Sequence, residues 1–130
     1  METTKRLIPL LVLMLIFACP AYSELPSATD IVIKQALSSG KPAVIDLGAR
    51  SCHICKKMAP ILESLSAEYR GKASVLFIDI HKDPSTAEKF RIQMIPTQIF
   101  FDAKGKEVKR HVGFMEKADI VKEMKALGVK

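Results

Sequence analysis

Two cysteines separated by two residues form the part of this sequence best suited to chemistry. Cys52 and Cys55 stand in the segment "CHICK", and the third cysteine, Cys19, lies in an apolar N-terminal run. Such a pair serves as half of a zinc site, as a structural staple, or as a dithiol that exchanges electrons with another disulfide. The choice depends on the other ligands, on the compartment and on the structure that the pair opens.

The sequence supplies too few ligands for a structural zinc site. Such a site takes four ligands, usually from two cysteine pairs, whereas this chain has one pair and three scattered histidines, His53, His81 and His111. We therefore predict no metal and no bound cofactor. A purely structural bridge also explains little, because closing so short a ring stabilises a fold by only about 2 kcal/mol.

The redox alternative fits the position of the pair. An apolar run ends shortly before Cys52, and a helical pattern begins there. A helix N-terminus offers unpaired backbone N–H groups and partial positive charge, which stabilise a thiolate. The spacing places Cys52 at the exposed tip and turns Cys55 inward within disulfide reach. One cysteine then attacks a client disulfide, and the other resolves the mixed disulfide.

The N-terminal residues have the pattern of an export signal. Lys5 and Arg6 precede the apolar run Leu7–Ala18, and small residues at Ala21 and Ser23 favour cleavage after Ser23. We predict a signal peptide over residues 1–23 and a mature domain over residues 24–130, exported to the periplasm. Two alternatives stay open: an uncleaved signal that anchors the chain, and lipidation of Cys19.

Composition favours one globular domain without a nucleic-acid partner. The chain of 130 residues is 48% hydrophobic and 26% charged, with a net charge of +6. Its C-terminal lysines alternate with acidic residues and are not interleaved with aromatic ones. That pattern is typical of a solvated surface.

The elements that must position the cysteines follow from periodicity. A helix is expected over residues 27–40, with Ser27 in a capping-box-like start. The apolar runs Pro42–Leu47 and Ser74–Ile80 indicate buried strands. A helix from Cys52 to Gly71 joins them, so we expect a right-handed parallel crossover.

The second half of the chain predicts a short helix, a hairpin and a closing helix. The short helix covers Pro84–Phe90, and Gly105 suits a turn between two antiparallel strands, 97–101 and 107–113. Ile120, Val121, Met124 and Leu127 then share one helical face. The fold class is therefore α/β, a central mixed sheet with helices on both faces.

These features resemble the thioredoxin family over residues 28–128. The pair in "CHICK" is followed by Pro60, and Asp46 lies six residues before Cys52. "MIPT" (Met94–Thr97) is similar to the family's "GIPT", and Gly113 matches a family glycine near the active site. The resemblance implies a thioredoxin-like fold.

The resemblance also implies roles for individual residues. Asp46 would take the proton of Cys55, although a structural, hydrogen-bonded carboxyl is the alternative. The bond between Ile95 and Pro96 would be cis and lie against the cysteines, where the backbone edge pairs with an extended client segment. Gly113 would lie beside it.

The residues next to the cysteines depart from the family pattern. Ser51 replaces a tryptophan, and His53 with Ile54 replaces Gly-Pro. Ser51 and His53 are candidate client contacts, and His53 is either a solvent-facing spacer or a cation that favours the Cys52 thiolate. Phe77 stands where many thioredoxins carry a lysine.

We therefore predict an exported thiol:disulfide oxidoreductase that acts on protein disulfides, as a monomer, and more as a reductase than as an oxidase or isomerase. The resemblance implies a membrane thiol transporter as electron donor. The alternative from another class is a non-catalytic module that holds a peptide or Cu(I), which soft thiolates suit.

Overall fold

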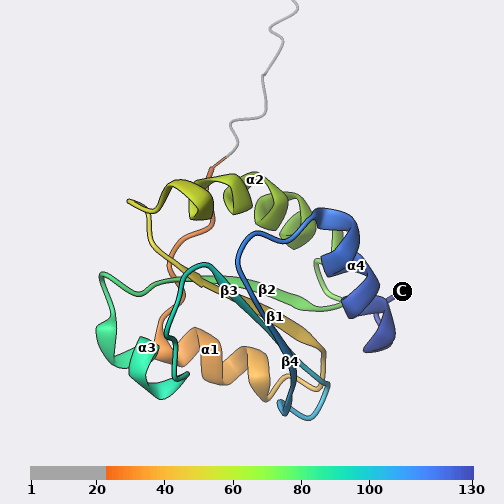
Figure 1. Cartoon of the computed structure of the whole chain (residues 1–130). Coiled ribbons are helices and arrows are strands. Elements are labelled where there is room, and N and C mark those ends of the chain that lie inside the picture. Colours follow the sequence, from red (N-terminus) through yellow and green to blue (C-terminus); the bar gives the residue numbers. More distant parts are fainter. Residues whose placement is uncertain (1–22) are drawn as a thin grey trace, which may run out of the picture.

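The computed structural model describes residues 23–130, which form a sheet between two layers of helices (Figure 1). Nearly all of the predicted signal peptide lies outside the described residues. The elements, in chain order, are α1 (Asp30–Leu37), β1 (Ala43–Gly48), α2 (His53–Glu68), β2 (Ser74–Asp79), α3 (Pro84–Lys89), β3 (Thr97–Phe101), β4 (Glu107–Val112) and α4 (Lys117–Ala126). Every predicted helix and strand is present, with ends shifted by a few residues.

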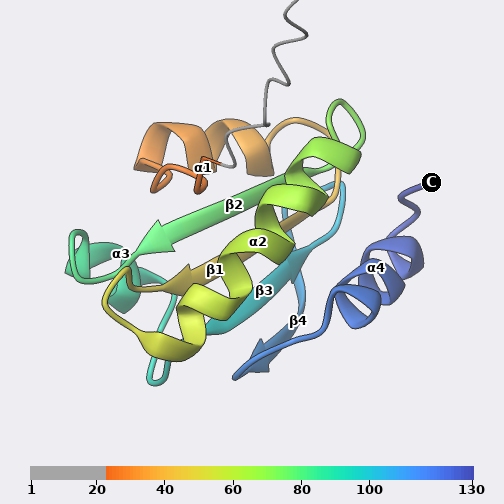
Figure 2. The ribbon, with the colours of Figure 1, turned by 90° about the horizontal axis from the view of Figure 1, so that it is seen from above.

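The four strands form one mixed sheet in the order β2-β1-β3-β4. β1 and β2 run parallel and are joined through α2, as the strand–helix–strand pattern predicts. β3 runs antiparallel to both β1 and β4. Seen from above, α2 crosses the sheet and its N-terminus lies near the ends of β1 and β2 (Figure 2). The prediction of a mixed sheet is confirmed.

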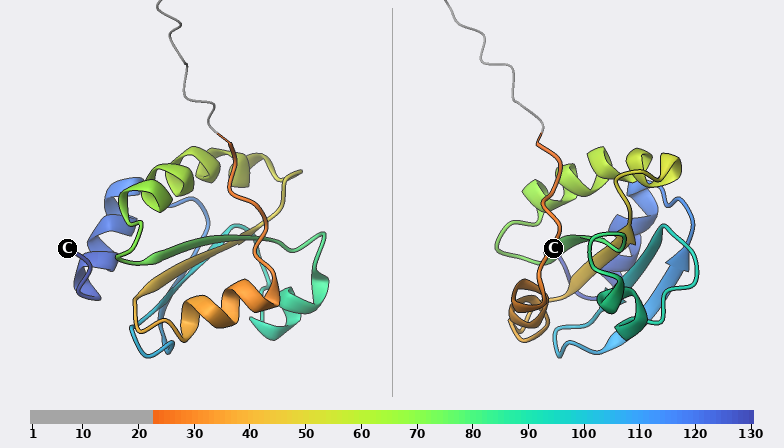
Figure 3. Two further views of the ribbon diagram at one scale, coloured as in Figure 1. Left: turned by 180° about the vertical axis from the view of Figure 1, so that it is seen from behind. Right: turned by 90° about the vertical axis from the view of Figure 1, so that its left-hand side faces the viewer.

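Each face of the sheet carries its own apolar core. α2 and α4 cover one face, and α1 and α3 cover the other (Figures 1 and 3). Successive side chains of β1 point to opposite faces, so Val44 packs under α2 while Ile45 and Leu47 pack over α1. Every residue of β1 is buried. Asp46 lies two residues after Val44, so its side chain points to the same face, toward α2.

The start of α1 differs from the expectation. Thr29, not Ser27, is the N-cap residue, and the Thr29 side chain accepts a hydrogen bond from the Val32 N–H. Ser27 instead forms a parallel bridge with Phe77, and its Oγ accepts from the Asp79 N–H at 2.9 Å. The segment before α1 thus follows the edge strand β2.

Within residues 23–130, none of the helices has the length and apolar character needed to cross a membrane.

Candidate active site

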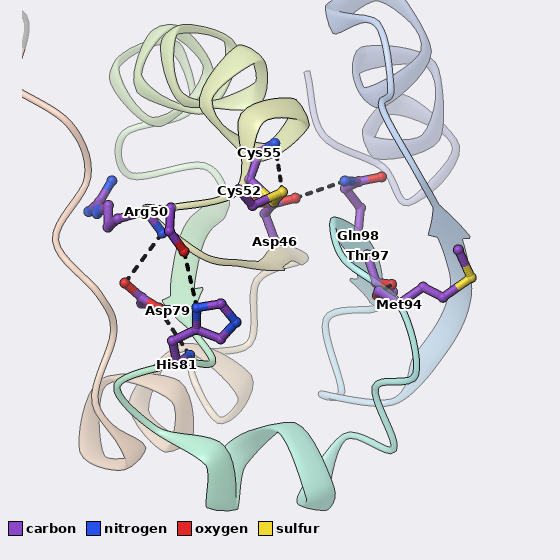
Figure 4. The surroundings of a disulfide bond; sticks show 10 residues. Asp46, Arg50, Cys52, Cys55, Asp79, His81, Met94, Thr97 and Gln98 are labelled. Atoms are coloured by element: carbon purple, nitrogen blue, oxygen red, sulfur yellow. Dashed lines mark hydrogen bonds between the residues drawn. A yellow bond between two sulfur atoms is a disulfide. The ribbon is translucent and has the colours of Figure 1, made fainter.

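Cys52 and Cys55 form a disulfide at the N-terminus of α2 (Figure 4). Their Cα atoms are 5.2 Å apart. Cys52 is the N-cap residue, and its Sγ accepts a hydrogen bond from the Cys55 N–H at 3.2 Å. Cys52 is half-buried, whereas Cys55 is only 4% exposed. The prediction that the pair lies within disulfide reach, with Cys55 turned inward, is confirmed.

Gly48 allows α2 to lie close to the end of β1. A Cβ atom at Gly48 would stand 3.1 Å from Cys55 Sγ and 3.2 Å from Cys55 Cβ, closer than most side-chain contacts. Asp46 precedes Gly48 by two residues and so shares its face of the sheet. The sulfur of Cys55 lies over Gly48, and the carboxyl of Asp46 is the neighbouring side chain of β1 on the same face, which α2 covers.

The Asp46 side chain has no access to solvent. Phe77 on β2 and Gln98 on β3 are its register partners. Gln98 Nε2 donates a hydrogen bond to Asp46 Oδ1 at 2.8 Å, and Asp46 Oδ2 has no protein partner. Burial raises the pKa of Asp46 from 3.8 to about 6, although the hydrogen bond from Gln98 opposes that rise. Near neutral pH this carboxyl can therefore both bind and release a proton.

Gln98 is a site residue that sequence reasoning missed. It is fully buried, and its Oε1 has no protein partner. The available signal was a lone amide in the otherwise apolar end of the strand "TQIFF". Its contact with Asp46 depends on the β1–β3 register, which no local pattern reveals.

The loop before β3 carries the expected cis bond, between Ile95 and Pro96. The Gly113 N–H donates to the Pro96 carbonyl at 2.8 Å, and Thr97 Oγ1 donates to the Met94 carbonyl at 2.7 Å. Thr97 pairs with Leu47, the residue before Gly48. Pro96 and Gly113 therefore lie at the same end of the sheet as the disulfide.

The loops after β1 and β2 are tied together by Asp79, which is buried. Its carboxylate accepts from the backbone N–H groups of Arg50 at 3.4 Å and His81 at 3.1 Å. Ser51 Oγ lies 3.2 Å from His81 Nδ1, within hydrogen-bonding distance. Ser51 is thus held against the loop that follows β2. Asp79 and His81 are therefore further residues of the candidate active site, beside those that the sequence predicted (Figure 4). His53, the first residue of α2, is exposed.

Phe77 is covered by a cation from another element. The Arg50 guanidinium lies 4.3 Å from the centre of the Phe77 ring and forms an ion pair with Glu24 at 2.7 Å. These residues, with Leu25 and Cys55, line a small cavity of about 10 Å³, enough for about one water molecule. Arg50 thus places a positive charge beside the cavity that Cys55 lines. The family resemblance did not single out this residue.

Comparisons with known proteins agree with this architecture. Residues 27–126 match the Thioredoxin family. Thioredoxins of Staphylococcus aureus strains Mu50 and MW2 are each 40% identical over 92 residues, which cover 71% of this chain and 86% of theirs. The crystal structure of chloroplastic thioredoxin z superposes with a TM-score of 0.70 at 25% identity, covering 82% of this chain and 96% of that one.

Fold and cysteine pair together define a thiol–disulfide oxidoreductase. The chain belongs to the thioredoxin family. Within residues 23–130, no cluster of three or more His, Cys, Asp or Glu side chains is arranged to hold a metal ion.

Proposed function

We propose that the protein is an exported reductase of protein disulfides. The observation that carries the proposal is the arrangement of the pair: a half-exposed Cys52 at a helix N-terminus, a buried Cys55, and a buried carboxyl that titrates near neutral pH on the same face of β1 as Gly48. This arrangement gives the two thiols different tasks.

In the first step the Cys52 thiolate of the reduced protein attacks one sulfur of a client disulfide. A bond forms between Cys52 Sγ and that client sulfur, the client S–S bond breaks, and the second client sulfur leaves as a thiolate. The α2 N-terminus lowers the free energy of the attacking thiolate.

In the second step Cys55 resolves the mixed disulfide. Its thiol gives its proton to Asp46, and the resulting thiolate attacks Cys52 Sγ. The first client sulfur leaves as a thiolate, and the Cys52–Cys55 disulfide forms. Two electrons have then passed from the protein to the client, and a reductant must restore the dithiol.

An apolar surface near the pair suits an extended client segment. Four exposed large apolar side chains stand on α2, in the loop before β3, at the end of β4 and in the loop after β4: Ile54, Met94, Val112 and Phe114. The cis bond between Ile95 and Pro96 lies in the same loop as Met94, and the Pro96 carbonyl accepts from the Gly113 N–H. Such a surface favours unfolded or extended protein segments over small polar disulfides.

Export, the electron donor and the direction of electron flow have separate supports. The basic start and the apolar run Leu7–Ala18 support export, and the family resemblance supports a membrane thiol transporter as the electron donor. The buried Asp46 supports the reductase direction. We propose that the protein acts as a monomer.

The test is reduction of insulin disulfides by dithiothreitol, followed by turbidity. The mature protein is expected to accelerate precipitation, whereas the Cys52→Ser/Cys55→Ser variant, which keeps the same surface, is expected to match dithiothreitol alone. Equilibration with glutathione then gives the reduction potential, and a reductase requires a value near the reducing end of the thioredoxin-fold range.

Other outcomes assign other functions. A potential near the oxidising end would replace the reductase with an oxidase or isomerase. Stoichiometric copper retention without any acceleration of insulin reduction would point to the binding module instead.

A further inference from the structure

A row of four side chains crosses the sheet beneath α2. The strand registers pair Phe77 of β2 with Asp46 of β1, Asp46 with Gln98 of β3, and Gln98 with His111 of β4. Directly paired residues share one face of a sheet. Asp46 therefore lies between an aromatic ring and an amide, and the amide is its only hydrogen-bonding neighbour in the described protein.

The hydrogen bond between Gln98 and Asp46 is placed to orient the carboxyl. It uses Oδ1 and leaves Oδ2 without a partner, inside a region that excludes solvent. An unpaired buried oxygen is costly and therefore rare in folded proteins. Figure 4 shows Gln98 approaching Asp46 from the β3 side. The free oxygen is thus available to accept a proton.

An amide suits both protonation states of the carboxyl. Its NH₂ group donates to Oδ1 of an ionised Asp46, as observed, and it can keep that bond when Oδ2 is protonated, because Oδ1 is then still an acceptor. A leucine or methionine at this position could not donate such a bond.

We propose that Gln98 is a positioning residue for proton transfer, which holds Asp46 through Oδ1 so that Oδ2 receives the proton of Cys55. The proposal rests on the proposed function, in which Asp46 serves the resolving thiol. The helix α2, which covers this face of the sheet, carries the thiols of Cys52 and Cys55 at its start. β2 presents Phe77 and β3 presents Gln98, neither of which titrates, and His111 follows in the same row on β4.

The test variant is Gln98→Met, which keeps an unbranched side chain of similar length but removes the donor. Losing a hydrogen bond to the charged form raises the pKa of Asp46. If Asp46 is then about one-tenth ionised at pH 6 instead of about half, resolution slows about fivefold there and recovers at higher pH. Carboxyl carbon NMR on the oxidised protein measures the titration directly.

The kinetic measurement uses the reduced protein and excess oxidised glutathione. The attack by Cys52 depends on the glutathione concentration, whereas resolution by Cys55 does not, so the two rates separate. Only resolution is expected to change in Gln98→Met. Ile99→Met is the matched control, because it places the same side chain at the next residue of β3 but on the opposite face of the sheet.

Repeating the Gln98→Met change in an Asp46→Asn variant distinguishes an effect on the position of Asp46 from a general effect on packing. In Asp46→Asn, the Gln98→Met change is expected to have no further effect on resolution, since its target is gone. An unchanged Asp46 titration, an equal slowing of resolution at every pH, or a full slowing in the Asp46→Asn background would overturn the proposal. Because neither readout uses a protein client, wild-type protein inactive on insulin would refute the proposed function without deciding the role of Gln98.

Discussion

At the scale of single residues, Asp46 works against the stability of the fold. A carboxyl with no solvent access and one amide partner is costly to ionise, which is why its pKa rises from 3.8 to about 6. Above its folded pKa the protein carries a buried charge that the unfolded chain would place in water. A purely structural residue at this position would gain from being apolar, so the acid is best explained by its chemistry.

The cost of this charge predicts a pH-dependent stability. Below pH 3.8 Asp46 is protonated in both states and carries no penalty; the penalty grows as pH rises towards 6 and is complete at pH 7. The shift corresponds to about 3 kcal/mol. Asp46→Asn should therefore be more stable than the wild type at pH 7 by up to about that amount, and the difference should nearly vanish at pH 3.5.

Urea unfolding of the oxidised proteins at both pH values measures the difference. Glu88→Gln, the same carboxyl-to-amide change at an exposed position of α3, controls for net charge. If Asp46→Asn raises the free energy of unfolding equally at pH 3.5 and pH 7, the destabilisation by Asp46 does not come from its ionisation.

At the scale of elements, the start of α2 decides which cysteine meets the client. Cys52 caps the helix and is half-buried, and Cys55 lies one turn further on, packed close to Gly48. The helix N-terminus acts most strongly on the cap residue, because its effect falls off within the first turn. The two thiols are therefore unequal before any client binds.

This inequality predicts asymmetric trapping. Cys55→Ser keeps the attacking thiol and removes the resolving one, so clients should accumulate as mixed disulfides on Cys52 that a reductant releases. Cys52→Ser leaves only a buried thiol and should trap few or none. The comparison uses non-reducing gels of both variants from the exporting host, with free thiols alkylated at lysis. Equal trapping would show that the pair is not ordered in this way.

At the scale of the whole molecule, the features that the sequence predicted depend on neighbours in the chain, whereas the features that it missed depend on contacts between distant segments. Local patterns identified the cysteine pair, the helix that it opens and the acid in β1, because each depends on neighbours in the chain. The family resemblance, carried by "MIPT", implied the cis bond before Pro96. Gln98 and Asp79 act through partners on other strands or loops, 52 and 29 residues away. Their roles depend on strand order and register, which arise only when both cores pack. Ser27 was assigned to the wrong partner for the same reason.

The mature chain is expected to begin near Glu24. The contacts of the described domain include Glu24, whose carboxylate pairs with Arg50, and Leu25, which packs against the core under α2. Ser23 is exposed. Cleavage after Ser23 would therefore preserve the segment that covers the cavity behind Cys55, and it would remove Cys19, leaving only the active pair of cysteines.

Intact-mass analysis of protein from the exporting host should accordingly give a chain beginning near Glu24, in the periplasmic fraction. Ala21→Arg and Ser23→Arg place a bulky charged residue at the small positions that favour cleavage, so each should leave the signal attached. Cys19→Ser is the matched control and should change nothing, since simple cleavage does not use that thiol. A diacylglycerol mass on Cys19 that this variant abolishes would instead establish a lipoprotein, and a wild-type chain that keeps Leu7–Ala18 in the membrane fraction would establish an anchor.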